Sequence, residues 1–200
     1  QGIIGWYMVQ SGLIENITVS HYRLSIHLLI AFSILTSLIW ILLSSINRTK
    51  KKFFQVNTSH LLLKFLLILL FIQIILGAFV SGLDAGKIYQ TWPLMNGKYY
   101  PDDIYVNSFF NFDNPSFVQF IHRNIAYLIF LVSILLGVNI YKRKDLKVFN
   151  SFLIYFLFIL IQIVLGILVL ISGVNIFIAS MHQISIIFLI VSAINLYYRS

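Results

Sequence analysis

The sequence contains no cysteine among its 200 residues. Structural disulfides, thiolate metal sites, iron–sulfur clusters and cysteine nucleophiles are therefore excluded within this chain. Charge is also scarce, since 10% of the residues are Asp, Glu, Lys or Arg while 60% are hydrophobic. Soluble domains do not have this composition, and long apolar runs at this density indicate an all-α integral membrane protein.

Carboxylates are missing from the apolar runs. The acidic residues all fall in the segments between those runs: Glu15, Asp84, Asp102, Asp103, Asp113 and Asp145. A zinc or di-iron centre inside the membrane is therefore disfavoured, because hard metals prefer carboxylate oxygens and catalytic zinc usually has about three protein ligands.

Five apolar runs are long enough to span a hydrocarbon core of about 30 Å at about 1.5 Å per residue. The predicted helices cover residues 23–46, 61–81, 117–141, 149–171 and 176–198. A sixth apolar piece, residues 1–13, is too short to span, starts without Met and shows no basic segment of a signal peptide. We interpret it as the end of a longer helix, and the chain as a fragment that lacks its N-terminus.

The positive charges are unevenly placed. The net charge of +8 arises mainly from two short loops and the C-terminus, with Arg48, Lys50, Lys51 and Lys52, then Lys142, Arg143, Lys144 and Lys147, and finally Arg199. Basic loops alternate with acidic or neutral ones, as the positive-inside rule requires. We therefore predict that loops 47–60 and 142–148 face the cytoplasm or matrix and that loop 82–116 faces the periplasm. Nucleic-acid binding is disfavoured, and the bilayer is the expected partner.

The loop after the second predicted full helix is unusually rich in structure-forming residues. Trp92, Pro93, Asn96, Gly97 and Pro101 lie within ten positions of one another. Loops of this length without regular structure are usually functional or disordered, and the many aromatic residues argue against disorder. We predict that this loop folds over a site at the membrane surface.

A short pattern occurs three times. It consists of a Gln and a Gly four residues apart, followed by an outward loop and a helix that begins near a histidine: Gln1, Gly5 and His27, then Gln73, Gly77 and His122, then Gln162, Gly166 and His182. Residues four apart share one face of a helix, and a small residue there admits another helix or a flat ligand. Such repeats often place a site between the repeated units of a membrane protein.

The three histidines of the repeat are predicted to lie at one depth, about one to two turns into the bilayer. His122 and His182 belong to equivalent helices, and two imidazoles on facing helices can bind a haem iron axially. A proton relay and a purely structural role are the alternatives. His21 and His60 are predicted to be interfacial.

Two arginines lie near the outer ends of predicted helices. Arg23 and Arg123 could each bind an anionic group at that surface. A guanidinium fits a haem propionate and a lipid phosphate equally well, so the sequence leaves both open.

Several motifs together resemble those of the haem A synthase family. They are the loop segment 82–97, GLDAGKIYQTWPLMNG, the opening segment 1–13, the segment 22–27, YRLSIH, the segment 118–123, VQFIHR, and the pair His182 and Gln183. The resemblance runs over essentially all 200 residues, with the motifs in the expected order.

The resemblance implies an eight-helix enzyme built from two pseudo-symmetric four-helix halves. In this chain, residues 1–46 would be the remainder of the N-terminal half, with a partial helix at 1–13 and a full helix at 23–46. Residues 47–60 would be a cytoplasmic linker, and residues 61–200 a complete haem-binding half. The family oxidises a methyl group of haem O to a formyl group by successive hydroxylations, in a bacterial or mitochondrial inner membrane. Haem O synthase and cytochrome oxidase assembly factors would be its partners.

The resemblance also implies roles for particular residues. His122 and His182 match the axial ligands of a haem B, with Arg123 beside them, and His27 matches a ligand of the substrate haem, with Arg23 beside it. The acidic catalytic residue and a partner histidine of the family would lie upstream of Gln1, so no catalytic residue is assigned, and Glu15 lies in a different loop. The fragment alone is therefore expected to bind haem without catalysing the reaction.

Two other functions use some of the same features. A non-catalytic b-type cytochrome that carries electrons in the membrane needs the same histidines but no catalytic acid. A transporter built from repeats is disfavoured by the scarcity of charges inside the predicted spans.

Overall fold

The computed structural model of the chain describes residues 1–10, 12, 18–48, 51, 53, 61–104 and 111–200. The α-helices in these residues are α1 (Gly2–Val9), α2 (His21–Ile46), α3 (Leu61–Gly82), α4 (Pro115–Lys142), α5 (Leu146–Ile171) and α6 (Ile176–Arg199), with a short 3-10 helix, η2 (Ala85–Lys87). All regular structure in this part of the chain is helical, apart from one isolated bridge between Met95 and Lys98. Helices α2 to α6 are long and apolar enough to cross a membrane, which confirms the predicted fold class.

Two helices begin earlier than predicted because a side chain caps them. The Asn114 side chain accepts hydrogen bonds from the backbone N–H groups of Ser116 and Phe117, so α4 begins at Pro115 rather than at residue 117. The Asp145 carboxylate does the same for the next helix, so α5 begins at Leu146 rather than at residue 149. Asn and Asp favour this position because their oxygens satisfy N–H groups that have no partner within the helix.

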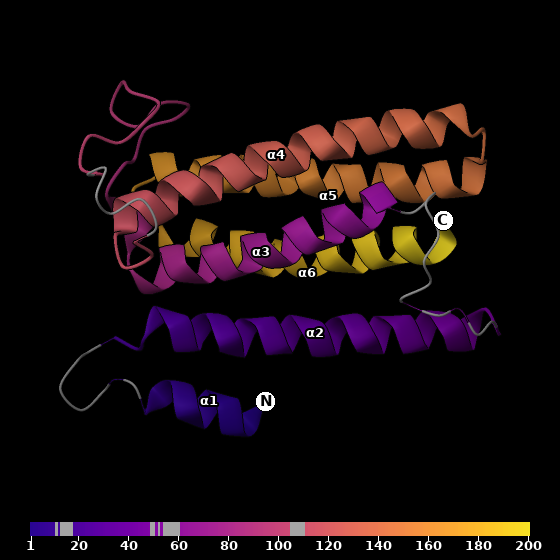
Figure 1. The fold of residues 1–200 in the computed structure, drawn as a ribbon, viewed down its shortest axis with the longest axis horizontal. Coiled ribbons are helices and arrows are strands. Elements are labelled where there is room, and N and C mark those ends of the chain that lie inside the picture. Colours follow the sequence, from indigo (N-terminus) through magenta and orange to yellow (C-terminus); the bar gives the residue numbers. More distant parts are fainter. Residues whose placement is uncertain (11, 13–17, 49–50, 52, 54–60, 105–110) are drawn as a thin grey trace.

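The long helices run side by side, and α3 to α6 form a bundle (Figure 1). Within it, α3 packs along α4 and α5 packs along α6. Helix α2 lies against α3 and α6, and α1 packs on α2. Successive long helices run in opposite directions, as expected of a chain that crosses a bilayer repeatedly (Figure 1).

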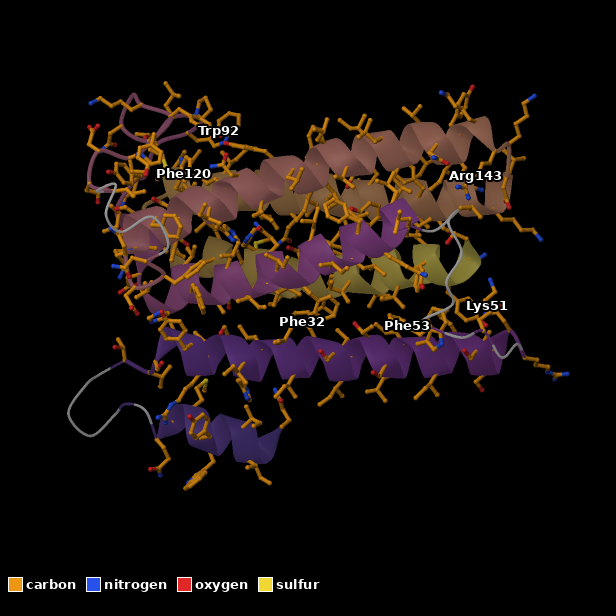
Figure 2. The ribbon with its side chains drawn as sticks, viewed as in Figure 1. Phe32, Lys51, Phe53, Trp92, Phe120 and Arg143 are labelled. Carbon is orange, nitrogen blue, oxygen red and sulfur yellow. The ribbon has the colours of Figure 1, made fainter. Side chains whose placement is uncertain are left out.

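The two ends of the molecule differ in composition. Trp92 and Phe120 lie at one end, whereas Lys51, Phe53 and Arg143 lie at the other (Figure 2). We call the first the loop end, because the described part of the segment 83–114 lies there. We call the second the basic end, because it carries Arg48, Lys51, residues 142–147 and Arg199. Four residues singled out from the sequence, Glu15, Lys50, Lys52 and His60, lie outside the described part of the chain.

The buried core of the bundle lies mainly toward the basic end. The buried residues of α5 end at Ile159, and those of α6 begin at Leu189. Tyr155 and Ser133 are fully buried within this core, and their hydroxyl groups are 2.7 Å apart. The half of the α5–α6 hairpin nearer the loop end, residues 160–188, therefore presents apolar side chains that no described part of the protein buries.

Candidate functional site

The three copies of the repeat have the same geometry. In each, the Gln side-chain Nε2 lies within hydrogen-bonding distance of two atoms of the histidine, its main-chain carbonyl oxygen and its Nε2. These two distances are 3.1 and 3.4 Å for Gln1 and His27, 3.0 and 3.3 Å for Gln73 and His122, and 3.1 and 3.4 Å for Gln162 and His182. This agreement confirms that the sequence pattern is a structural repeat.

In each copy the imidazole ring lies close against the glycine. A Cβ atom added at Gly5 would lie 3.1 Å from His27 Cε1, one at Gly77 would lie 3.4 Å from His122 Cε1, and one at Gly166 would lie 3.2 Å from His182 Cε1. A Cβ would therefore crowd the ring at Gly5 and Gly166, and at Gly77 it would lie in van der Waals contact with the ring. The glycines therefore make space for the histidine rings, in addition to the close helix packing that small residues commonly allow.

The structure places His122 on α4 and His182 on α6, two helices of the same bundle. His27 lies on α2 instead, where it contacts Gln1 and Gly5 at the start of the chain. In all three rings the Nδ1 atom is buried and has no hydrogen-bond partner among the described residues. The bundle therefore holds two histidines with equivalent Gln and Gly neighbours, and the α1–α2 pair holds a third.

Exposed apolar side chains lie on the stretch of α5 and α6 that carries Gly166 and His182. No residue of α5 beyond Ile159 is buried, and no residue of α6 before Leu189 is buried. Exposed apolar residues in this stretch include Val164, Leu168, Ile184 and Phe188. A flat apolar ligand would remove such surface from water or lipid while leaving two imidazole nitrogens to bind a metal.

Arg123 fastens the long loop to α4. Its guanidinium donates to the main-chain carbonyl of Thr91 at 2.9 Å and to that of Tyr89 at 2.8 Å. The Gln119 side chain, one helical turn earlier, donates to the same Tyr89 carbonyl at 2.9 Å. Both side chains are buried. The described part of the loop is thus folded against the helix, and two guanidinium nitrogens of Arg123 bind the loop. That the loop covers a site at the membrane surface stays a prediction.

A second hydrogen-bond network joins two parts of the loop to each other and to the start of α4. The Tyr89 hydroxyl donates to the Asp103 carboxylate at 2.7 Å, and the Ser116 hydroxyl donates to the other oxygen of that carboxylate. Burial and the contact with Asp103 raise the pKa of Tyr89 to about 12. Burial opposes ionisation of Asp103, but the hydrogen bonds from Ser116 and Tyr89 outweigh it and hold the pKa of that carboxyl below its ordinary value. The network therefore joins a neutral phenol to an ionised carboxylate at neutral pH.

The aromatic residues of the loop occupy different environments. Tyr89 is buried, whereas Trp92, Tyr99 and Tyr100 are exposed by 46%, 58% and 40%. The rings of Tyr99 and Tyr100 meet Phe120 edge-on at 5.6 and 5.2 Å. These contacts tie the loop to α4, and packing of the loop aromatics on a macrocycle stays a prediction.

Arg23 and His21 form contacts at the start of α2. Arg23 donates to the Tyr7 main-chain carbonyl at 2.9 Å, and its guanidinium lies 4.1 Å from the Tyr7 ring centre. His21 Nε2 is 3.2 Å from a carboxylate oxygen of Asp113. Arg23 therefore joins α2 to α1, and His21 joins α2 to the end of the long loop. Binding of a propionate or a phosphate by Arg23 stays a prediction.

Two elements of the site were not expected from the sequence. The first is the bond from each Gln to its histidine, since the sequence pattern indicated only a shared helix face. The second is that the side chains of Gln119 and Arg123 both donate hydrogen bonds to the main-chain carbonyl of Tyr89. A signal for the second existed, because Gln119 and Arg123 are polar residues four apart on one face of an otherwise apolar helix.

Together these features define a class, a membrane-embedded helical protein with a repeated Gln–Gly–His unit and a loop folded over one end. A family model for cytochrome oxidase assembly protein, COX15-CtaA, matches residues 1–194, and the chain belongs to this family.

Relatives agree with this assignment. A protein of Pelagibacter ubique named "Heme A synthase" is 47% identical over 203 residues, covering 100% of this chain and 59% of its own length. Proteins of the same name from Rickettsia prowazekii and Wolbachia pipientis are 39% and 40% identical, each covering 92% of this chain, and 55% and 52% of their own lengths. The chain thus spans a little over half the length of these relatives.

Proposed function

We propose that this chain is the haem-binding part of a haem A synthase, an enzyme that oxidises a methyl group of haem O to a formyl group by successive hydroxylations. The names of the relatives support the activity. The observation that carries the proposal is the recurrence of the Gln–Gly–His unit within one bundle, with His122 on α4 and His182 on α6. In this proposal His122 and His182 hold a haem B, and His27 binds the substrate haem.

The residues present fit a haem. Two imidazoles lie on helices of the same bundle, each with a nitrogen that is buried and unpartnered among the described residues. Gly77 and Gly166 let the rings lie close to the neighbouring helices, and exposed apolar side chains lie on α5 and α6 in the same stretch as Gly166 and His182. A haem iron bound by two histidines supplies one-electron redox chemistry.

The chain's own residues would orient and enclose the cofactor. The Gln side chains hold the histidines, the glycines set how near the rings lie to the neighbouring helix, and Arg123 holds the loop over the loop end of α4. A loop held there would limit the access of water to the haem edge.

We also propose the setting of the protein in the membrane. The basic end would face the cytoplasm or matrix, since Lys and Arg accumulate on that side of inner-membrane proteins. The loop end would face the periplasm, and residues 61–200 would form the haem B half. Haem O synthase and cytochrome oxidase assembly factors would be partners of the whole enzyme.

The test is a reduced-minus-oxidised spectrum with pyridine haemochrome quantification, on protein that is monodisperse and helical in detergent. About one low-spin haem B per chain is expected, and His122→Ala or His182→Ala should remove it. His27→Ala in the full-length protein should spare that haem and lower haem A output. A well-folded wild-type protein that never acquires haem would overturn the proposal.

A non-catalytic b-type cytochrome is the second candidate, because the paired histidines of the bundle would serve it equally well. The two functions differ in their products, since only the enzyme makes a formylated haem. Haem extracted from a host that supplies haem O should contain haem A when the full-length protein is expressed. Haem B alone would favour the electron carrier.

A further inference from the structure

We infer that the long loop contacts the headgroup layer of the membrane through an exposed surface made of Trp92, Leu94, Tyr99 and Tyr100, which we call the aromatic face. Its partner is the interfacial layer of a phospholipid bilayer, on the side where the loop end emerges. Contact with lipid requires helices that can span a membrane, which this chain has, and does not require a bound haem.

Helix α4 has an exposed stripe that the described part of the bundle leaves uncovered. Exposed apolar residues recur along it three or four positions apart, as they do on one side of a helix. They are Tyr127, Leu128, Leu131, Ile134, Leu135 and Val138. Phe120 and Asn124 continue the same spacing toward the loop end. In a helix that crosses a bilayer, an uncovered apolar stripe of this kind contacts the lipid tails.

The loop packs on the part of this stripe nearest the loop end. The Tyr99 hydroxyl donates to the Asn124 side-chain oxygen, and the rings of Tyr99 and Tyr100 both meet Phe120 edge-on. His122 is two residues from both Phe120 and Asn124, and residues two apart on a helix are rotated by about 200°, so they lie on nearly opposite sides. The two tyrosines therefore extend the lipid-facing side of α4, away from the histidine.

The turn that carries Trp92 and Leu94 is fixed by its own hydrogen bonds. The Thr91 hydroxyl donates to the Leu94 carbonyl and accepts from the Asn96 N–H group, both at 2.8 Å. The Met95 side chain is buried, whereas Trp92 and Leu94 are exposed. Trp92 lies beside α4 on the side away from α2 and α6 (Figures 1 and 2). The turn therefore presents apolar side chains outward in a fixed conformation, which lowers the entropy cost of binding a surface.

The depth of the aromatic face matches the membrane interface. Helix α4 has 28 residues and is about 42 Å long at about 1.5 Å per residue, whereas a hydrocarbon core is about 30 Å thick. With Lys142 at the headgroups of the basic end, about 20 residues of helix cross the core and reach the opposite boundary near Phe120. Trp and Tyr concentrate at such boundaries, because each combines an apolar ring with a polar N–H or O–H group.

The charge of the loop is compatible with this position. Lys98 is the only charged residue between positions 88 and 100, and its ammonium group lies 2.8 Å from the Asp102 carboxylate. The aromatic face itself carries no charge, so its contact with the interface costs no desolvation of an ion.

The test measures the fluorescence of Trp92 in haem-free protein reconstituted into phosphatidylcholine bilayers. The emission that is lost in Trp92→Phe belongs to Trp92, so the difference between the two proteins isolates it from other tryptophans. Lipids brominated near the headgroup should quench this emission strongly, and lipids brominated near the ends of the acyl chains should quench it less. Iodide in the aqueous phase should quench it little.

Trp40→Phe is the matched control. The Trp40 ring meets Phe53 and Tyr198 edge-on at 4.9 and 5.1 Å, so the emission lost in this variant reports an indole that is packed among other rings. Brominated lipids should quench it less than they quench Trp92. Both replacements keep an aromatic ring, so both variants should fold.

Two results would overturn the inference. Quenching of Trp92 by iodide, without quenching by brominated lipid, would place the aromatic face in water. Quenching by neither agent would show that protein covers the face, either another part of the full-length protein or a second copy.

A second measurement uses the haem-loaded, full-length protein in membranes. A phospholipid that carries a photoactivatable diazirine near its headgroup should cross-link to residues 92–100, as located by mass spectrometry. If these cross-links form in the haem-free protein but not in the loaded one, a macrocycle covers the aromatic face and the inference is wrong. If the protein binds no haem, the proposed function fails, but the quenching experiment still decides whether the loop contacts lipid.

Discussion

Gly166 shows how a single residue sets the space available to a histidine of the site. An added Cβ would lie 3.2 Å from His182 Cε1 and 3.7 Å from its Nδ1. Replacing Gly166 with Leu should push the ring aside, and overpacking of this kind costs about 1–3 kcal/mol. We expect haem B affinity to fall about tenfold to about a hundredfold, measured by haemin titration of the purified protein.

The control for this prediction is Gly2→Leu. A Cβ at Gly2 meets nothing within 4 Å, so the same added side chain has room there. Haem affinity should be unchanged in the control. Equal affinity in Gly166→Leu and the wild type would show that the glycine serves only helix packing.

At the scale of an element, the loop depends on Arg123. Its guanidinium donates to two loop carbonyls, and Arg123→Met would remove both bonds while Gln119 retains its bond to Tyr89. Hydrogen bonds to charged groups contribute about 1.5–3 kcal/mol, so we expect at least about tenfold faster amide hydrogen exchange in loop residues 89–96. Exchange mass spectrometry on the haem-free protein measures this. If Arg123 served only a haem propionate, the variant would leave exchange in the haem-free loop unchanged.

The same loop should respond to acid through Asp103. The pKa of this carboxyl lies below its ordinary value of 3.8, so the folded loop favours the ionised form. That stabilisation is fully present above about pH 4 and is lost as the pH falls through the lowered pKa. Exchange protection of the loop, corrected for intrinsic rates, should therefore decline below pH 3.8.

Asp103→Asn should remove this acid dependence and reduce protection at neutral pH about fivefold, as expected for the loss of about 1 kcal/mol. The matched control is Asp102→Asn, because Asp102 contacts the exposed Lys98 at 2.8 Å at the surface. An acid response that persists in Asp103→Asn, or that disappears in Asp102→Asn, would contradict the assignment. At high pH, protection should decline as Tyr89 loses its proton, between its ordinary pKa of 10 and its raised pKa of about 12.

Elements of the fold could be predicted from the sequence more completely than the site. The long apolar runs predicted the first and last residues of helices α2 to α6 to within a few positions, because length and hydrophobicity alone decide a span. The starts of α4 and α5 were misplaced where Asn114 and Asp145 cap a helix, and α2 begins at His21, two residues before its predicted start, without a side-chain cap. The bond between Gln73 and His122 joins residues 49 positions apart, so it depends on the register between two helices. Periodicity within one helix contains no information about that register.

At the scale of the whole molecule, burial of α5 and α6 differs between the two ends of the bundle. The core near the basic end joins all four bundle helices, whereas α5 and α6 have no buried residue between positions 160 and 188. At the basic end, Lys51 donates to the Tyr198 carbonyl at 2.6 Å, and Trp40 meets Phe53 edge-on at 4.9 Å. Trp40 also meets the Tyr198 ring edge-on at 5.1 Å, which joins α2 to α6. The α5–α6 hairpin is therefore buried mainly at the basic end, whereas α3 and α4 also have buried residues at the loop end.

The absence of cysteine makes the orientation of the whole molecule measurable with single introduced thiols. Lys98→Cys places one at the loop end, and Lys142→Cys places one at the basic end; both positions are exposed. Because Lys and Arg are retained on the cytoplasmic side, an impermeant maleimide added to intact bacterial spheroplasts should label Cys at 98 and label Cys at 142 only after permeabilisation. Acidic replacements of Lys50, Lys51 and Lys52 should reduce this difference, since they remove the charge bias of one loop. Labelling of position 142 alone in intact spheroplasts would reverse the proposed orientation and place the loop in the cytoplasm.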